Sequence, residues 1–367
     1  MRAWIIGLSI LFAFGAGAAR AAEASAAEPW RALTRGDVEA AYALLRDNHP
    51  GATAEANDPA FTAALARAHD QALARAAKVE GHEGYVATLG AFAGALGDGH
   101  IGSGPRFLPR TVRWAGLVAA RRGDAWIVAG GDPAVAGGDF TGARIEGCDG
   151  QPADVRARTA LGFRADASSA ATQVLQGVWL LVDEGNPFLP APHACTLDQG
   201  GKPLAVTLHW VSIDRGVLLS RWWKRPYGAA GFGVRPSGAG IWIGLQALDP
   251  RAQPVLDAVE AQADAIRAAP YVVVDLRGDG GGDDGYAWRL AEAMYGPAHV
   301  AAVLGASGSA TAGCPPIFRA SADNIAAFVR QAAQFQASGD AEGAREYEKA
   351  IQAMTAARAA GRALTGD

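Results

Sequence analysis

Apolar residues between positions 35 and 97 recur at helical spacing. Proline disfavours helix at the residue before it and glycine favours a turn, so the first predicted helix should end at the segment Asn48-His49-Pro50-Gly51. The segment Asn57-Asp58-Pro59 predicts the start of a second helix that runs through residue 78, and a third is predicted over residues 83–96. The apolar face of the first helix is formed by Val38, Ala41, Tyr42, Leu44 and Leu45.

The pattern changes between Trp114 and Trp210. Short runs of Val, Ile, Leu and Trp are separated there by turn residues, which predicts strands. Clear examples are residues 125–128 and 204–210, and residues 142–150 are expected to form a strand followed by a tight Asp-Gly turn. The middle of the chain is therefore predicted to be rich in β-structure.

Strands and helices are predicted to alternate from residue 240 onward. Strands are expected at residues 241–245 and 271–276, and helices at residues 252–268 and 286–294. The second strand is apolar except for one aspartate, which is typical of a strand covered on both faces. The tail over residues 322–364 is predicted to be helical with one break. Alternation of this kind predicts an α/β fold.

Composition narrows the class of protein. Half of the 367 residues are apolar, 19% are charged, and the net charge is −4. This balance gives no reason to expect a nucleic-acid partner, which would need a concentrated basic face. The cysteines show no zinc-type spacing, and no metal is expected. Cys148 and Cys195 lie in one segment and are the expected disulfide pair, with Cys314 left over; three unpaired thiols are the alternative.

The first residues are typical of an export signal. Arg2 precedes an apolar run over residues 4–14, and Ala19-Arg20-Ala21 is a small-residue cleavage site, so residues 1–21 are predicted to be a signal peptide. The run is shorter than the ~20 residues that a membrane span requires. The mature chain is expected to be periplasmic or extracellular, without a membrane anchor and with a disordered leader over residues 22–28. An uncleaved anchor is the alternative.

Four glycines follow the second predicted strand of the α/β region and precede a helix. Backbone N–H groups in such a turn suit an oxyanion or a phosphate. Gly280-x-Gly282-x-x-Gly285 has the spacing of a dinucleotide site, but Asp279, Asp283 and Asp284 would repel a pyrophosphate. An acidic residue about 20 positions further on, which would hold a ribose, is also missing. No organic cofactor is expected.

Two segments resemble the tail-specific (C-terminal processing) proteases. Asp275-Leu-Arg-Gly-Asp-Gly-Gly-Gly282 resembles their signature Asp-Leu-Arg-Gly-Asn-Gly-Gly-Gly, with Asp279 where asparagine is commoner. The resemblance implies that the N–H of Gly280 or Gly281 helps to form an oxyanion hole. Asp275 and Arg277 are expected to form an internal ion pair that fixes the turn rather than to take part in catalysis.

The second segment, Leu96-Gly-Asp-Gly-His-Ile-Gly102, resembles the Leu-x-Asp-x-His-Thr element of the same family, with Ile101 in place of threonine. The pattern is closest to the branch related to the tricorn core protease. In that branch this histidine is the general base, which implies that role for His100. A lysine base is the alternative, but no lysine follows the glycines before Lys349.

The family resemblance also implies a domain plan and a fold. The plan has an N-terminal helical segment over residues 30–105, a β-rich PDZ-like subdomain over residues 112–215, and a crotonase/ClpP-like α/β catalytic core over residues 216–367. The PDZ-like assignment depends on residues 138–152, where a strand meets an Asp-Gly-x-Pro turn, and a plain β-subdomain is the alternative.

The nucleophilic serine is the missing part of the pattern. The family places this serine in a small-residue turn, after the core strand that follows the helix next to the glycine-rich turn. Ser307 and Ser309 follow the apolar run at residues 300–304, where the family has an outer strand, whereas Ser321 reads as a helix N-cap and Ser338 lies in a polar helix break. We therefore expect a C-terminally truncated catalytic core, with Ser309 as the nucleophile of a compact variant as the alternative.

The predicted function is that of an exported serine-type endopeptidase homologue acting on a polypeptide substrate, inactive if the strand that bears the nucleophile is missing. A non-catalytic peptide-binding protein of the same ancestry is the second hypothesis.

Overall fold

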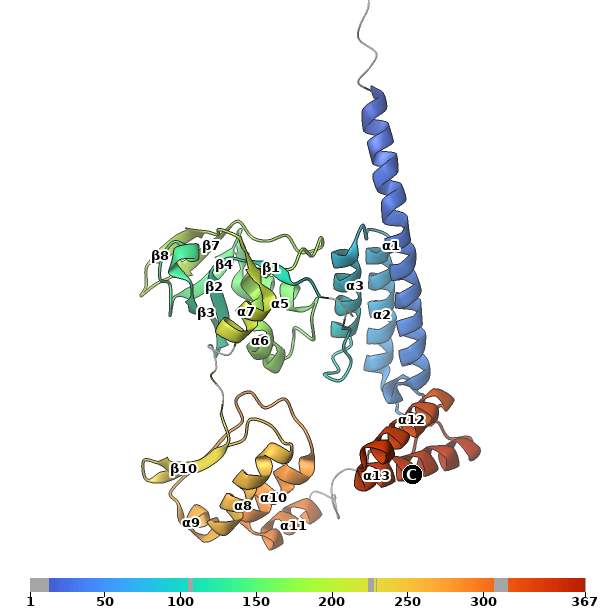
Figure 1. Cartoon of the computed structure of the whole chain (residues 1–367), viewed down its shortest axis with the longest axis vertical. Helices are drawn as coiled ribbons and strands as arrows, with labels where there is room; N and C mark the ends of the chain where they lie inside the picture. Colours follow the sequence, from blue (N-terminus) through green and yellow to red (C-terminus); the bar gives the residue numbers. More distant parts are fainter. Residues whose placement is uncertain (1–12, 105–107, 224–227, 229, 307–315, 367) are drawn as a thin grey trace, which may run out of the picture. The chain divides into compact units, whose positions relative to one another are not determined.

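The computed structural model describes residues 13–104, 108–223, 228, 230–306 and 316–366 (Figure 1). These residues form two compact units, one of residues 1–217 with 317–367 and the other of residues 218–316. Each unit mixes helix and sheet. Residues 216–367 were expected to form one domain, whereas in the structure residues 317–367 pack with the N-terminal unit.

Three helices open the first unit: α1 (Ala13–Asn48), α2 (Pro59–Ala76) and α3 (His82–Gly94), with a short 3₁₀ turn at Pro50–Ala52. Asp58 caps α2 by accepting a hydrogen bond from the Phe61 N–H at 2.9 Å. The predicted disordered leader is wrong, because residues 22–28 belong to α1, as their alanines and glutamates favour. Among the described residues, no helix has the length and apolarity to span a membrane.

Two C-terminal helices, α12 (Ala322–Ser338) and α13 (Ala341–Ala359), complete this unit. The predicted break is confirmed at Gly339, which adopts the left-handed conformation (φ 81°) that ends a helix. The Glu55 carboxylate accepts hydrogen bonds from the N–H groups of Ala363 and Leu364 at 2.7 and 2.8 Å. The Ser321 hydroxyl donates to Asn48 at 2.6 Å. These contacts attach the C-terminal segment to the end of α1 and to the loop between α1 and α2, far away in the sequence.

The middle of the chain is β-rich, as predicted. Its larger sheet has the order β2-β3-β4-β7-β8, with β5 beside β4, and a second sheet has the order β6-β1-β9. Asp149 (φ 48°) and Gly150 (φ 78°) form the predicted tight turn between β4 and β5. The strands are β1 (Thr111–Trp114), β2 (Leu117–Arg122), β3 (Ala125–Gly131), β4 (Arg144–Cys148), β5 (Gln151–Pro152), β6 (Val182–Asp183), β7 (Ala194–Asp198), β8 (Pro203–Thr207) and β9 (Val211–Asp214). The helices between them are α4 (Pro133–Ala136), α5 (Ala153–Leu161), α6 (Ala170–Gln176) and η2 (Gly177–Leu181), and α7 (Arg215–Leu218) follows β9.

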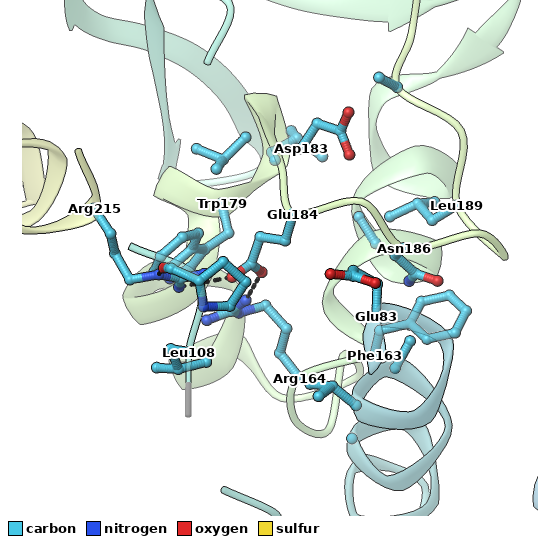
Figure 2. Close-up of a pocket in the computed structure, with 18 of the residues that line it drawn as sticks. Glu83, Leu108, Phe163, Arg164, Trp179, Asp183, Glu184, Asn186, Leu189 and Arg215 are labelled. Carbon is cyan, nitrogen blue, oxygen red and sulfur yellow. Dashed lines mark hydrogen bonds and ion pairs between the residues drawn. The ribbon is translucent and has the colours of Figure 1, made fainter. Parts of the chain in front are cut away.

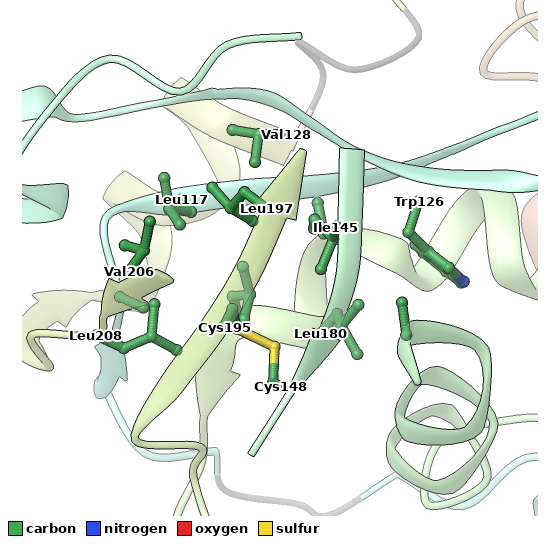
Figure 3. Close-up of a cluster of buried hydrophobic side chains, with 14 of the residues drawn as sticks. Leu117, Trp126, Val128, Ile145, Cys148, Leu180, Cys195, Leu197, Val206 and Leu208 are labelled. Carbon is green, nitrogen blue, oxygen red and sulfur yellow. A yellow bond between two sulfur atoms is a disulfide. The ribbon is translucent and has the colours of Figure 1, made fainter. Parts of the chain in front are cut away.

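A disulfide crosses this sheet. Cys148 on β4 pairs with Cys195 on the neighbouring strand β7, which confirms the predicted pairing. Both residues are buried in the core of the β-rich segment (Figure 3). The third cysteine, Cys314, lies outside the described residues.

Removal of this disulfide is expected to destabilise the first unit. The two cysteines are 47 positions apart, and a cross-link of that span stabilises a protein by about 2–4 kcal/mol. The double substitution Cys148→Ser and Cys195→Ser should therefore lower the melting temperature to that of the reduced wild type. If dithiothreitol lowers the melting temperature of the wild type and of the double variant equally, the disulfide is not what stabilises the oxidised wild type.

The second unit contains one three-stranded sheet in the order β10 (Gly233–Ser237), β11 (Gly240–Gly244) and β12 (Val272–Asp275). β11 pairs antiparallel with β10 and parallel with β12. One face of the sheet packs on an apolar core that includes Leu256, Val259 and Leu290. The unit begins with η3 (Leu219–Trp223), and its other helices are η4 (Pro250–Ala252), α8 (Gln253–Ala261), α9 (Ala263–Ala268), α10 (Asp284–Tyr295) and α11 (Pro297–Ala306).

Two expectations about this unit are wrong. β12 is not covered on both faces, because the Val273 side chain on one face is 41% exposed. Residues 300–304 do not form an outer strand but lie in helix α11, which begins with Pro297 at the position where proline favours a helix start.

Candidate functional site

The glycine turn after β12 is fixed by an ion pair. The Arg277 Nε donates to Asp275 Oδ1 at 2.9 Å and the Arg277 Nη2 to Asp275 Oδ2 at 2.6 Å. The Trp242 Nε1–H from β11 also donates to Asp275 Oδ2 at 3.2 Å. The hydrogen bonds from Arg277 lower the pKa of the Asp275 carboxyl to about 2, so this group stays ionised and is unsuited to proton transfer.

We call residues 276–282 the glycine elbow. Three of its glycines have positive φ: Gly278 (85°), Gly281 (97°) and Gly282 (145°). Gly282 forms a bridge with Leu248, and Asp283 caps α10 by accepting a hydrogen bond from the Gly285 N–H at 2.8 Å. The elbow therefore joins a strand end to a helix start, as the sequence predicts.

The backbone donors of the elbow are not equivalent. The Gly281 N–H donates to the Asp279 carboxylate at 2.8 Å, and the Asp279 N–H donates to the Leu276 carbonyl at 2.9 Å. The Gly280 N–H makes no hydrogen bond to any described residue, and a Cβ at Gly280 would meet nothing within 4 Å. Of the two predicted oxyanion donors, Gly280 is thus the one left available.

His100 lies in the turn after α3, and its side chain is fully exposed to solvent. The turn is shaped by Asp98, whose Oδ1 accepts a hydrogen bond from the His100 backbone N–H at 2.8 Å. The His100 Nδ1 lies 3.5 Å from the same oxygen. The hydrogen bond from the His100 backbone, followed by that from His49, lowers the pKa of Asp98. An ionised carboxylate beside an exposed imidazole is an arrangement that can orient a general base.

His49, which the sequence places at the end of the first predicted helix, is a second histidine at this turn. Its Nδ1 accepts a hydrogen bond from the Gly51 N–H at 3.1 Å, so its proton is on Nε2, which donates to Asp98 Oδ2 at 3.2 Å. Its ring stacks on Phe61 with centroids 4.0 Å apart. His49 therefore holds Asp98, and through it the turn that carries His100. His49 and Asp98 are separated by 49 positions in the sequence, and no local pattern predicts their contact.

The serine candidates have different outcomes. Ser307 and Ser309 lie outside the described residues. The Ser321 Oγ accepts a hydrogen bond from the Asn324 N–H at 3.1 Å, which confirms it as the N-cap of α12. The Ser338 Oγ donates to the Phe335 carbonyl at 2.9 Å. Neither described serine has a histidine partner. His100 belongs to the first unit and the glycine elbow to the second.

Within the described part of the chain, no three His, Cys, Asp or Glu side chains form a group that could hold a metal ion. The carboxylates in and beside the elbow have protein partners: Asp275 binds Arg277, Asp279 accepts a hydrogen bond from the Gly281 N–H, and Asp283 caps α10.

Neither a protein-family model nor a curated protein matches the chain. Among solved structures, a crystal structure of mature CPAF, a chlamydial protease, matches with a TM-score of 0.47 and 13% sequence identity. The match covers 71% of this chain and 57% of that chain, so this chain spans less than two thirds of the length of CPAF. A TM-score below 0.5 does not establish a common fold, so the roles below depend on residues of this chain.

Proposed function

We propose that this chain is an exported serine-type peptidase homologue of the tail-specific protease family. The observation that carries the proposal is the glycine elbow, which holds the Gly280 N–H unbonded at the end of a strand and before a helix. A preorganised donor of this kind stabilises the oxyanion of a tetrahedral intermediate. The resemblance of the elbow to the family signature supplies the reaction class, hydrolysis of a peptide bond in a polypeptide substrate.

In this proposal His100 is the general base. The imidazole takes the proton of a serine hydroxyl as the oxygen attacks the peptide carbonyl, and returns it to the leaving amine. The Gly280 N–H donates to the oxyanion that forms. Asp98 positions His100 from one side, while Asp275 and Arg277 keep the elbow in shape. Ser309 is the candidate nucleophile.

The remaining parts of the proposal concern domains and location. We assign the β-rich segment as PDZ-like, supported by its antiparallel sheet and by the Asp149-Gly150 turn, and the second unit as part of a crotonase/ClpP-like core. The branch related to the tricorn core protease is supported by the His100 element. Export is supported by the predicted signal peptide and by the Cys148–Cys195 disulfide, since disulfides persist in oxidising compartments.

One observation favours the alternative of a peptide-binding protein without catalysis. The Asp279 carboxylate accepts a hydrogen bond from the Gly281 N–H, so it places a negative charge within the elbow. A negative charge there opposes the oxyanion that a peptidase must stabilise. The amide of asparagine, the commoner residue in the family, would fill the same position without charge.

A fluorophosphonate probe tests the proposal. A serine peptidase should be labelled covalently at its nucleophile, and mass spectrometry would show whether the labelled residue is Ser309. Loss of the label in Ser309→Ala, but not in Ser321→Ala, would support Ser309. Tight binding of peptides with neither labelling nor turnover would overturn the peptidase proposal in favour of the binding protein.

The charge at position 279 predicts a gain of activity. Asp279→Asn keeps an oxygen acceptor for the Gly281 N–H and removes the negative charge. Two unit charges about 5 Å apart in water-like surroundings repel by about 1 kcal/mol, so kcat/KM for a peptide substrate should rise about fivefold. Asp283→Asn is the matched control, because asparagine caps a helix as well as aspartate. An equal gain in both variants, or none in Asp279→Asn, would contradict the role of the elbow.

A further inference from the structure

A cavity of about 310 Å³ lies within the first unit (Figure 2). Its wall includes residues of α3, of η2 and of the loop that follows β6. Much of the wall is apolar and includes Leu108, Phe163, Leu180, Leu189 and Trp210. A volume of this size and an apolar lining are typical of sites for small ligands.

Two arginines converge on a single carboxylate in the wall. Arg164 and Arg215 both form an ion pair with Glu184, and Arg215 Nη1 lies 2.7 Å from Glu184 Oε1 (Figure 2). The Arg164 guanidinium also lies over the Trp179 ring, 4.0 Å from its centroid. These contacts fix the plane of the Arg164 guanidinium at the cavity surface.

Charged side chains of both signs line the cavity. Asp183, a second carboxylate in the wall, is held by Arg113 at 2.9 Å. The third, Glu83, is half-exposed and has no arginine partner among the described residues. Arg156 adds a further positive charge to the wall and donates to the Pro190 carbonyl. The wall therefore holds three arginines and three carboxylates, but Asp183 is already paired with Arg113, which is not part of the wall, and Glu184 is shared by two arginines.

The arginine donors are only partly used. Arg215 is 9% exposed; its Nε donates to the Pro109 carbonyl at 3.1 Å, while its buried Nη2 has no hydrogen-bond partner in the described structure. The recorded bonds of Arg164 engage Nη1 and Nε, which leaves Nη2 unbonded to the described residues. Burial, the largest influence, lowers the pKa of Arg164, and the neighbouring charge of Arg215 acts in the same direction. A buried donor without a partner is costly, which makes a purely structural ion-pair cluster a poor account of this site.

We infer that this cavity binds an apolar molecule that bears one carboxylate. Its carboxylate would accept hydrogen bonds from the free edge of the Arg164 guanidinium, and its body would lie against the apolar wall near Phe163 and Leu189. Recognition here is by side chains around a cavity and differs from the addition of a peptide strand to a sheet edge. The inference goes beyond the proposed function, because it involves no bond cleavage.

Calorimetric titration of the purified chain tests the inference, with N-acetyl-L-phenylalanine as the probe and its C-terminal amide as the uncharged match. The acid should bind at least tenfold more tightly than the amide, by about 1.4 kcal/mol or more. Arg164→Gln should weaken binding of the acid at least tenfold. Val86→Phe, which fills the cavity from α3 without changing the arginines, should do the same. Arg144→Gln is the matched control, since Arg144 pairs with Glu146 and does not line the cavity.

The carboxylate could belong to a small molecule or to the C-terminus of a polypeptide. A short peptide that ends in phenylalanine with a free C-terminus distinguishes these two sources. Binding of this peptide as tightly as the acid identifies a polypeptide end, and binding of the acid alone identifies a small molecule; both outcomes support a carboxylate site. Equal binding of acid and amide, absence of saturable binding, or retention of binding in Val86→Phe would overturn the inference. His100→Ala should bind the acid as the wild type does, so failure of the peptidase proposal would leave this result unchanged.

Discussion

His100→Ala is expected to abolish peptide hydrolysis by this chain almost completely. A positioned general base contributes about 10²–10⁴ to a rate, so kcat/KM should fall about 10³-fold. Folding should be unaffected, because the His100 side chain is fully exposed and only its backbone N–H bonds Asp98. The measurement is cleavage of casein or of a fluorogenic peptide, with circular dichroism to show that the variant is folded.

His209→Ala is the control for this prediction. His209 is another exposed histidine of the same unit, and it follows β8 rather than α3. Its removal should change kcat/KM by less than twofold. A base other than His100 would be indicated if His100→Ala kept half of the wild-type activity, and the roles assigned to Asp98 and His49 would then be structural only.

Local signals explain what the sequence predicted well. Asp58 and Ser321 begin helices because their side chains cap exposed N–H groups, and Gly339 ends a helix because it adopts a positive φ. The Asp149-Gly150 turn has the residues that a two-residue hairpin requires. Each of these signals depends on a few neighbouring residues, so it can be read without knowledge of the tertiary structure.

The features that were missed depend on residues far apart in the chain. The exposure of Val273 is decided by which elements pack on its face of the sheet, and the chain pattern around residues 272–274 does not contain that information. The apolar run in α11 is too short to distinguish a strand from a helix by periodicity, although Pro297 is a start signal that favours the helix. The cavity arginines Arg164 and Arg215 meet at Glu184 only after folding.

Gly282→Ala is expected to disrupt the elbow and destabilise the second unit by about 3 kcal/mol. A Cβ at this position would lie 1.9 Å from the Leu248 carbonyl oxygen and 2.6 Å from its carbon. Both are backbone atoms, so no side-chain rotation can relieve the clash. The φ of 145° adds strain for any residue with a side chain, at a cost of about 1–3 kcal/mol. The hydrogen bond from the Asp283 N–H to the Leu248 carbonyl at 2.9 Å would also be lost, at about 1 kcal/mol.

Gly280→Ala is the matched control for the same substitution in the same turn. The Gly280 φ is not positive, and a Cβ there would meet no atom within 4 Å. Alanine keeps the backbone N–H, so both the stability and any oxyanion donation should stay close to wild type. Because the protein has two compact units, hydrogen exchange over residues 240–295 is the measurement that reports on the second unit alone. We expect faster exchange over these residues in Gly282→Ala than in Gly280→Ala. Equal exchange in the two variants would show that the Leu248–Gly282 bridge does not hold the elbow in place. The position of the Gly280 donor would then have another cause.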